Sequence, residues 1–233
     1  MNMKTNTHRR GLHRIVAFLL CAVCVFSLLP AQAFAAGAGQ KASSWLGDQY
    51  VGSDGQHYYS PVPTNFLAYN SDGTTDKRSG SGGSAYRHYM LTDSDGVTHS
   101  VYCVESGIPY NTSENTYTSE NGTNSDYLNM LPSAARRGIT LTAIYGWKPG
   151  ASLPVSGINE DDYKMATQII LWEYQQQLRS DPYSRHSNGH ASADQYYSVV
   201  AGRPAEKAYN WILEQVASHS TVPSFTAANK GDA

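Results

Sequence analysis

The sequence predicts an α+β fold in which a mixed β-sheet core is joined to a helical subdomain. Two runs rich in β-branched and aromatic residues, YRHYMLT (86–92) and VTHSVYCVE (97–105), are separated by the polar turn DSDG. This pattern is typical of a β-hairpin, which we expect over about residues 86–105. From about residue 128 the apolar residues recur with helical spacing, so the later part of the chain is predicted to be largely helical.

The N-terminus has the pattern of a secretory signal peptide. Residues 1–14 carry four basic residues and no acidic residue, an almost unbroken apolar run extends from Ile15 to Leu29, and an A-x-A cleavage site ends at Ala35. The apolar run is shorter than the roughly 20 residues of a membrane span, so a retained anchor is the less favoured alternative. We therefore predict a signal peptide over residues 1–35.

Cleavage of that peptide would leave 198 of the 233 residues. This length suits one domain with a hydrophobic core, which we expect over residues 36–220, followed by a linker or tail over 221–233. Cleavage removes four of the 17 Lys and Arg residues and none of the 19 Asp and Glu residues, which leaves a net charge of about −6. An acidic chain of this kind argues against nucleic acid or an anionic membrane as the partner of the mature form.

The second strand of the predicted hairpin carries the only cysteine outside the signal peptide. Because side chains alternate along a strand, Cys103 should share one face with His99 and Glu105 and lie near the end of the strand. The Gly/Ser-rich segment 70–85 and the polar segment 110–126 are predicted to be loops.

Three helical segments are predicted after the hairpin. Residues 128–147 should hold a short helix followed by a second apolar helix or strand. The clearest segment begins after the N-cap residue Asn159, has three acidic residues in its first turn and continues to Arg179. Its middle turns are apolar nearly all round, so we expect this helix to be mostly buried. The Asp181-Pro182 pair should end it, and a last helix is predicted over 204–219.

A single cysteine in an exported domain cannot form an internal disulfide. Cys103 is therefore a partner in an intermolecular bond, a reactive thiol, or a buried residue that acts as a small hydrophobe. The cysteine count by itself leaves these three interpretations open.

Gln168 is the second unusual residue, because it lies in the most apolar turns of the predicted buried helix. A primary amide in such surroundings costs about 1 to 3 kcal/mol unless its donors and acceptor are paired. Either Gln168 is a core glutamine that bonds to backbone groups, or its amide has been consumed in a covalent bond.

Two short motifs surround these residues, YCVE at 102–105 and ATQIILWEY at 166–174, with the glutamine 65 residues after the cysteine. Together, and in this order, they resemble the thioester (TQXA) domains of Gram-positive surface adhesins. Ile170 stands where the family name expects alanine, which changes the packing of that turn. The residues that match the family motifs are Tyr102, Cys103, Glu105, Thr167, Gln168 and Trp172.

The resemblance implies a thioester between Cys103 and Gln168, which would bridge strand and helix. A thioester is a better acyl donor than an amide because sulfur feeds the carbonyl weakly and thiolate is a better leaving group than an amine. An incoming lysine amine would form a stable amide with the Gln168 acyl group and release the Cys103 thiol. Glu105 and His99 are candidates for the base that takes the amine proton, although both also suit exposed strand positions.

The resemblance also implies a biological setting. The expected partner is an amine-bearing host or matrix protein at a cell surface, captured by a domain that reacts once, without turnover and without a cofactor. We expect a secreted or cell-surface protein, attached to the cell wall and extended by stalk domains if a longer chain carries a sorting signal.

Two other functions fit parts of the sequence. A secreted cysteine hydrolase would use Cys103 as nucleophile and a histidine as base, with His88, His99, His186 and His190 as candidates. That hypothesis leaves the segment around Gln168 unexplained. A non-covalent protein- or carbohydrate-binding module would use the exposed tyrosines. A metal site is the least favoured, because the spacing of His186 and His190 falls in a predicted loop.

Overall fold

The computed structural model describes residues 39–61, 65–69, 74–79, 83–108, 110–113, 117–118 and 126–221. All of them belong to one compact unit, Ala38–Ala233. The predicted signal peptide, residues 1–35, and nearly all of the predicted tail, residues 221–233, lie outside the described residues, and both stay predictions.

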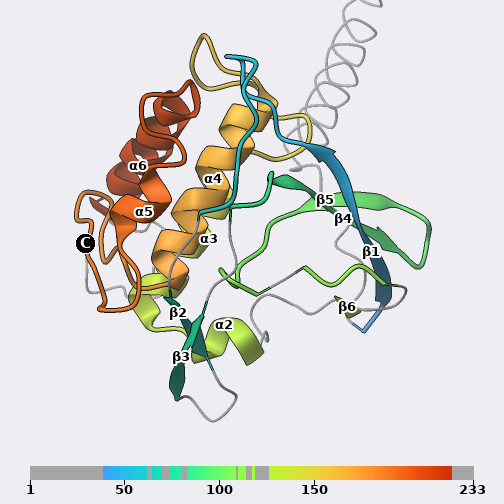
Figure 1. Cartoon of the computed structure of the whole chain (residues 1–233), viewed down its shortest axis with the longest axis horizontal. Coiled ribbons are helices and arrows are strands. Elements are labelled where there is room, and N and C mark those ends of the chain that lie inside the picture. The colour runs from blue at the N-terminus through green and yellow to red at the C-terminus, as the bar shows by residue number, and fades with distance from the viewer. Residues whose placement is uncertain are drawn as a thin grey trace, which may run out of the picture. The chain divides into compact units, whose positions relative to one another are not determined.

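A four-stranded antiparallel sheet forms one side of the fold (Figure 1). Its strands are β1 (Lys41–Gln49), β4 (Arg87–Asp93), β5 (Thr98–Val101) and β6 (Tyr117–Thr118). They lie side by side in the order β5-β4-β1-β6. The predicted hairpin corresponds to β4 and β5, with Tyr89 opposite Val101. Together with the helices, this sheet confirms the predicted α+β class. No sequence signal predicts β1, which is held by pairing along β4.

The hairpin is shorter than predicted. Strand β5 ends at Val101, so the expectation that Cys103 and Glu105 lie on the strand is wrong. The backbone of Cys103 forms its hydrogen bonds with the side chain of Gln168 instead of with a neighbouring strand. The cysteine is therefore positioned by a helix as well as by the sheet.

A second sheet corrects the expectation that residues 70–85 form only a loop. Strands β2 (Asn65–Tyr69) and β3 (Thr75–Ser79) pair antiparallel, with Leu67 opposite Lys77. Every residue of β3 is exposed, whereas the middle of β2 is buried. The polar β3 sequence becomes a strand because the apolar β2 beside it supplies the backbone partner. The short strand β6 likewise falls inside the segment predicted as a loop at 110–126.

Helices make up most of the second half. They are α2 (Asp126–Met130), α3 (Ser133–Tyr145), α4 (Glu160–Gln175), α5 (Ala193–Tyr197) and α6 (Ala205–Thr221). The predicted segment 128–147 thus consists mainly of two helices, and α6 extends two residues beyond its predicted end. Within the described ranges, no helix has the length and apolar character that crossing a membrane requires.

Helix α4 begins as predicted but ends early. The Asn159 side chain accepts a hydrogen bond from the Asp162 backbone N–H at 2.9 Å, and Asp162 accepts one from the Asn159 N–H at 2.8 Å, which completes a capping box. The helix was expected to continue to Arg179. Gln177 instead adopts a left-handed backbone conformation, with φ of 56°, and this ends the helical path.

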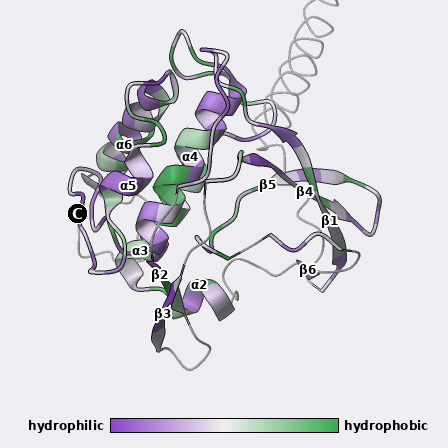
Figure 2. Ribbon diagram, viewed as in Figure 1, coloured by the Kyte–Doolittle hydropathy of each residue, from purple (hydrophilic) through white to green (hydrophobic). Residues whose placement is uncertain are grey.

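The core of the unit lies around α4, which is buried along almost its whole length. α3 and α6 pack against it, and in Figure 1 the four-stranded sheet lies on the side away from α6. Figure 2 shows the middle turns of α4 in green, the colour of hydrophobic residues. Gly138 of α3 permits a close approach, because a Cβ atom there would lie 2.1 Å from the Tyr174 ring.

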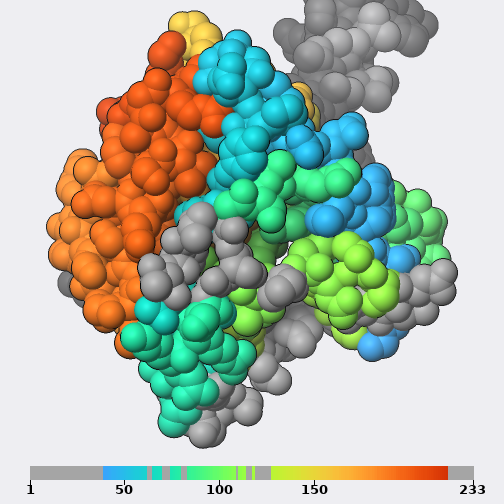
Figure 3. Space-filling view, in the orientation of Figure 1, coloured from blue at the N-terminus to red at the C-terminus, as the bar shows by residue number. Residues whose placement is uncertain are grey.

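The segment after β1 and the loop before α6 are joined at the surface. Figure 3 shows the first in cyan beside the second in orange. Arg203 makes an ion pair with Asp54 at 3.1 Å, and its guanidinium lies 3.6 Å from the centre of the Tyr58 ring. These contacts connect the beginning of the described chain to the helical part.

Candidate functional site

The side-chain amide of Gln168 pairs with the backbone of Cys103. The Cys103 N–H donates to Gln168 Oε1 at 3.1 Å, and Gln168 Nε2 donates to the Cys103 carbonyl oxygen at 2.6 Å. The hydroxyl of Tyr86 donates to the same Oε1 at 2.8 Å. Gln168 has no exposed surface, so these bonds satisfy an amide that would otherwise be costly to bury. The carboxamide thus lies against the residue that carries the thiol.

One residue, Trp147, connects the two sequence motifs. The Tyr102 hydroxyl donates to the Trp147 carbonyl oxygen at 2.7 Å, and the Trp147 N–H donates to Thr167 Oγ1 at 2.9 Å. Tyr102 precedes Cys103, and Thr167 precedes Gln168, so both neighbours of the reactive pair are held by the same backbone. This arrangement explains why side chains with a hydroxyl group, a tyrosine and a threonine, occur at these two positions.

The Cys103 thiol lies in a water-poor environment. Burial raises its pKa to about 11, and the neighbouring Glu105 backbone and Trp172 side chain offset part of that rise. Cys103 Sγ lies 3.3 Å from the Glu105 carbonyl oxygen, as a neutral S–H donor would. A free thiol at this position is therefore protonated at neutral pH, unlike the activated cysteine of a hydrolase.

A small pocket of about 90 Å³ opens beside Cys103. Trp172 and Glu105 line it, together with the rings of Tyr89 and Tyr110, which stack with their centres 4.4 Å apart. The indole N–H of Trp172 is buried and has no hydrogen-bond partner among the described residues. The pocket thus combines aromatic side chains, one carboxyl group and an unused donor next to the sulfur.

The two candidate bases are placed differently. Glu105 lines the Cys103 pocket, and burial raises the pKa of its carboxyl group, partly offset by the charge of Arg78. His99 pairs with Asp93 at 2.9 Å, near the turn of the hairpin, and does not line that pocket. Of the two, only Glu105 therefore adjoins the thiol.

Three of the four histidines considered for a hydrolase, His88, His99 and His186, have other side-chain partners. His88 pairs with Asp161 at 2.9 Å, and His186 lies 3.2 Å from Ser180. In the part of the chain that the structure describes, none of the four candidate histidines lines the Cys103 pocket. The described ranges also hold no cluster of three or more His, Cys, Asp or Glu side chains suited to a metal ion.

Sequence reasoning missed three residues around this site. Tyr86 and Trp147 carry no local signal, because their roles depend on partners far along the chain. Lys164 did carry one, as a charged residue in an apolar helix one turn before Gln168. It is buried, its Nζ lies 4.7 Å from the Trp147 ring centre and 3.3 Å from His88 Nδ1, and burial lowers its pKa to about 8.

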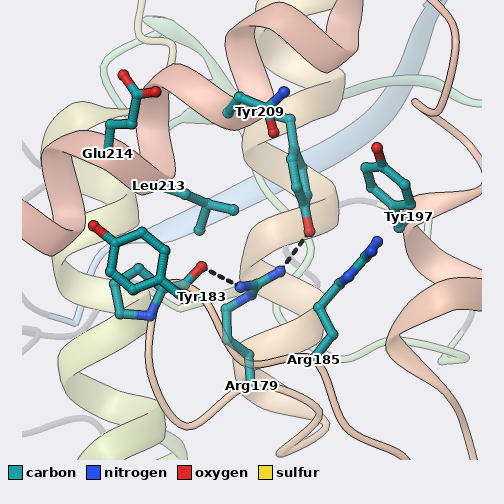
Figure 4. Close-up of a pocket in the computed structure, with 9 residues that line it drawn as sticks. Arg179, Tyr183, Arg185, Tyr197, Tyr209, Leu213 and Glu214 are labelled. Carbon is teal, nitrogen blue, oxygen red and sulfur yellow. Dashed lines mark hydrogen bonds between the residues drawn. The ribbon is translucent and has the colours of Figure 1, made fainter.

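A larger pocket, of about 340 Å³, lies at the C-terminal end of α4 (Figure 4). Arg179 lines this pocket. The Arg179 guanidinium, however, already donates to Glu173 at 2.9 Å, to Tyr209 at 2.6 Å and to the Pro182 carbonyl oxygen. Tyr209 in turn donates to Glu173. The charged groups of this cluster already bind one another, so the smaller pocket at Cys103 is the candidate site.

Comparison with known proteins agrees with this choice. A family model described as "Thioester domain" matches residues 100–218, slightly more than half of the chain. The matched range contains both the YCVE and the ATQIILWEY motifs and confirms the resemblance. Neither the search of curated proteins nor the search of solved structures found a match.

Proposed function

The chain belongs to the thioester domain family, and on this premise we propose that Cys103 and Gln168 form its internal thioester. The observation that carries the proposal is the pairing of the Gln168 amide with the Cys103 backbone, at 3.1 and 2.6 Å. This pairing keeps the acyl carbon beside the residue whose side chain must attack it. Holding two reacting groups in one place makes their reaction effectively intramolecular.

The bond forms by acyl transfer within the chain. The Cys103 sulfur adds to the side-chain carbonyl carbon of Gln168, the carbon–nitrogen bond breaks, and the nitrogen leaves as ammonia with the proton that the thiol gives up. The product keeps an activated acyl group in a buried pocket. Burial protects it, because few water molecules can reach the carbonyl.

Capture of a target uses the same carbonyl carbon. A primary amine adds to it, the carbon–sulfur bond breaks, and the proton lost by the amine ends on the Cys103 sulfur. The Trp172 indole N–H supports departure of the sulfur, because it lowers the pKa of the thiol and has no other partner among the described residues. The result is an amide crosslink between the Gln168 acyl group and the target.

The pocket suits a lysine side chain as the incoming group. The side chains of Tyr89 and Tyr110 that line the pocket offer apolar surface for the methylene chain of a lysine, and Glu105 offers a carboxylate for its charge. We assign Glu105 the further role of accepting the amine proton before attack. His99, held by Asp93 away from the pocket, is not part of this proposal.

We propose that the chain acts as a surface adhesin whose partner is an amine-bearing host or matrix protein. The expected export signal is in keeping with a secreted or cell-surface location. Each domain forms one crosslink and does not turn over, and the stored acyl group makes a cofactor unnecessary.

The intact mass of the purified domain tests the thioester. We expect a mass short of the sequence value by one ammonia, and recovery of the mass after methylamine treatment to the value of the methylamide. Cys103→Ala and Gln168→Ala should each abolish the deficit. A full mass, with no uptake of methylamine and with turnover on an amide or ester, would instead support the hydrolase.

The chain offers a matched control in Gln176. This residue is also fully buried, and its amide pairs with the Leu67 backbone at 2.6 and 2.8 Å, but no thiol is present there. Gln176→Ala should leave the deficit unchanged. Loss of the deficit in both glutamine variants would contradict the assignment to Gln168.

A further inference from the structure

We infer that the Tyr86 hydroxyl and the Cys103 backbone N–H form an oxyanion hole around Gln168 Oε1, which makes Tyr86 a catalytic residue. The inference rests on the proposed thioester and adds to it the group that accelerates its formation and its reaction with amines. Tyr86 lies outside both sequence motifs and outside the matched range 100–218.

Both reactions place negative charge on the same oxygen. Addition of the Cys103 sulfur to the amide, or of an amine to the thioester, gives a tetrahedral intermediate in which Oε1 carries the charge. The Tyr86 hydroxyl lies 2.8 Å from this oxygen and the Cys103 N–H donor lies 3.1 Å from it. Two donors aimed at the atom where charge develops are the defining geometry of an oxyanion hole.

The Tyr86 donor is held rigidly before any reaction. Its side chain is 3% exposed, and its ring contacts those of Tyr50 and Trp172 edge to face, with centres 4.8 and 5.7 Å away. The Tyr86 backbone bonds to Tyr50 and Tyr58 on either side. Burial also raises the pKa of the hydroxyl well above its ordinary value, so the group keeps the proton that it must donate.

The other paired glutamine of this region lacks the second donor. In the described chain, Gln176 Oε1 accepts one hydrogen bond, from the Leu67 N–H at 2.6 Å. Burying a glutamine against a backbone therefore does not require a second donor on its oxygen. The additional Tyr86 bond occurs at the glutamine that is proposed to react.

The reaction with an amine consumes no reagent other than the amine and the thioester. In amine capture, the nitrogen adds to the carbonyl carbon, the π electrons move to Oε1, and Tyr86 and the Cys103 N–H stabilise the charge. Collapse of the intermediate restores the carbonyl and expels the Cys103 sulfur, which takes the proton that the amine has lost. Tyr86 donates a hydrogen bond throughout and is unchanged at the end.

Tyr86→Phe tests this role, because it removes the hydroxyl and keeps the ring that packs in the core. The purified domain is treated with excess methylamine at pH 8, and release of the Cys103 thiol is followed over time. We expect the rate to fall by about 100-fold, the typical effect of losing one oxyanion-hole donor. A fluorinated tyrosine at residue 86 alone, whose hydroxyl is a stronger donor, should react at least as fast as the unmodified domain.

Tyr69→Phe is the matched control. The Tyr69 hydroxyl also bonds to α4, but at the Gln175 carbonyl oxygen and outside the Cys103 pocket, so the Tyr69→Phe domain should react at a rate near that of the unmodified domain. A folded Tyr86→Phe domain that never shows the ammonia deficit would support the inference, since formation uses the same oxygen. A normal deficit and a normal rate in Tyr86→Phe would overturn it.

These outcomes are distinct from failure of the proposed function. If the unmodified domain shows neither the deficit nor a reaction with methylamine, the thioester itself is wrong. If it shows both and Tyr86→Phe behaves identically, only the oxyanion hole is wrong.

Discussion

The middle of α4 and its C-terminal end use the same contact for different purposes. Gln168 in the middle pairs its amide with the backbone of Cys103, and Gln176, directly after the helix, pairs its amide with the backbone of Leu67. Both glutamines are fully buried. The first contact joins the helix to the segment after β5, and the second joins it to β2.

The difference lies in what surrounds each pair. At Cys103 the paired residue carries a thiol, the glutamine oxygen has an additional donor in Tyr86, and a pocket reaches the sulfur. Near Gln176 the polar groups are neutralised by one another, as in the Glu173–Arg179 ion pair. A buried, paired amide thus has a structural role unless a nucleophile lies beside it. At Gln168 a thiol does, and a pocket lets a target amine reach it.

The largest effect is expected from breaking the ion pair at the C-terminal end. Arg179→Met leaves the buried Glu173 without its cation, which we expect to cost about 3 to 5 kcal/mol of the free energy of unfolding. Thermal unfolding measures the loss. The folded fraction should keep the ammonia deficit, because this end of α4 does not contain the reactive pair.

Arg185→Met is the control for that variant. Arg185 is partly exposed and lies 3.5 Å from the exposed Asp194, so its loss should cost at most about 1 kcal/mol. Equal destabilisation by the two arginine variants would contradict the structural role of the buried pair.

An intermediate effect is expected at Gln176. Gln176→Ala leaves the N–H and the carbonyl of Leu67 unpaired, and Leu67 is buried, so we expect a loss of about 2 to 3 kcal/mol. Chemical denaturation measures this value, and the mass of the same sample reports the thioester. A destabilised domain with an intact ammonia deficit would support the structural role of Gln176, whereas an unchanged stability would contradict it.

The smallest effect concerns the free thiol and appears only at high pH. Gln168→Ala keeps the Cys103 thiol free, and in the folded chain burial raises the pKa of this thiol from its ordinary value of 9.0 to about 11. A raised folded pKa favours folding fully below the ordinary value, and this contribution is lost as the pH rises through the folded pKa. We expect a loss on the order of 2 kcal/mol between about pH 9 and 11.

The double variant Gln168→Ala/Cys103→Ala isolates this contribution. It lacks the thiol and retains every other titrating group, so the difference in unfolding free energy between the two variants should change with pH. A difference that stays constant from pH 8 to pH 11 would show that the Cys103 thiol is not shifted by burial. No thiol is titratable while the thioester is intact.

Much of the fold could be predicted because its signals are local. Asn159 and the acidic first turn specify the start of α4, and the DSDG turn specifies the hairpin of β4 and β5. The end of α4 was missed because Gln177, a residue type that does not signal a helix end, adopts a left-handed backbone conformation. Strand β3 was missed because its exposed polar residues gain strand structure only from pairing with β2.

For the candidate site, the types of residue were predictable and their contacts were not. A lone thiol and an amide in an apolar helix are visible in any reading of the chain. The donor Tyr86 is 82 residues from Gln168 and carries no motif, so only the packed structure identifies it. The expectation that His99 adjoins the thiol followed from strand alternation, which does not apply once β5 ends at Val101.

The sequence by itself determined where α4 begins, which segment is apolar enough to be buried, and which two side chains have the chemistry of a thioester. These properties depend on caps, periodicity and residue type, all of which act over a few neighbouring positions. Only the tertiary structure decided that Cys103 meets Gln168 across 65 residues, that Trp147 holds both motifs, and that Tyr86 faces the carbonyl oxygen. Such contacts depend on how buried polar groups find partners in the folded core, and those partners are distant in the chain.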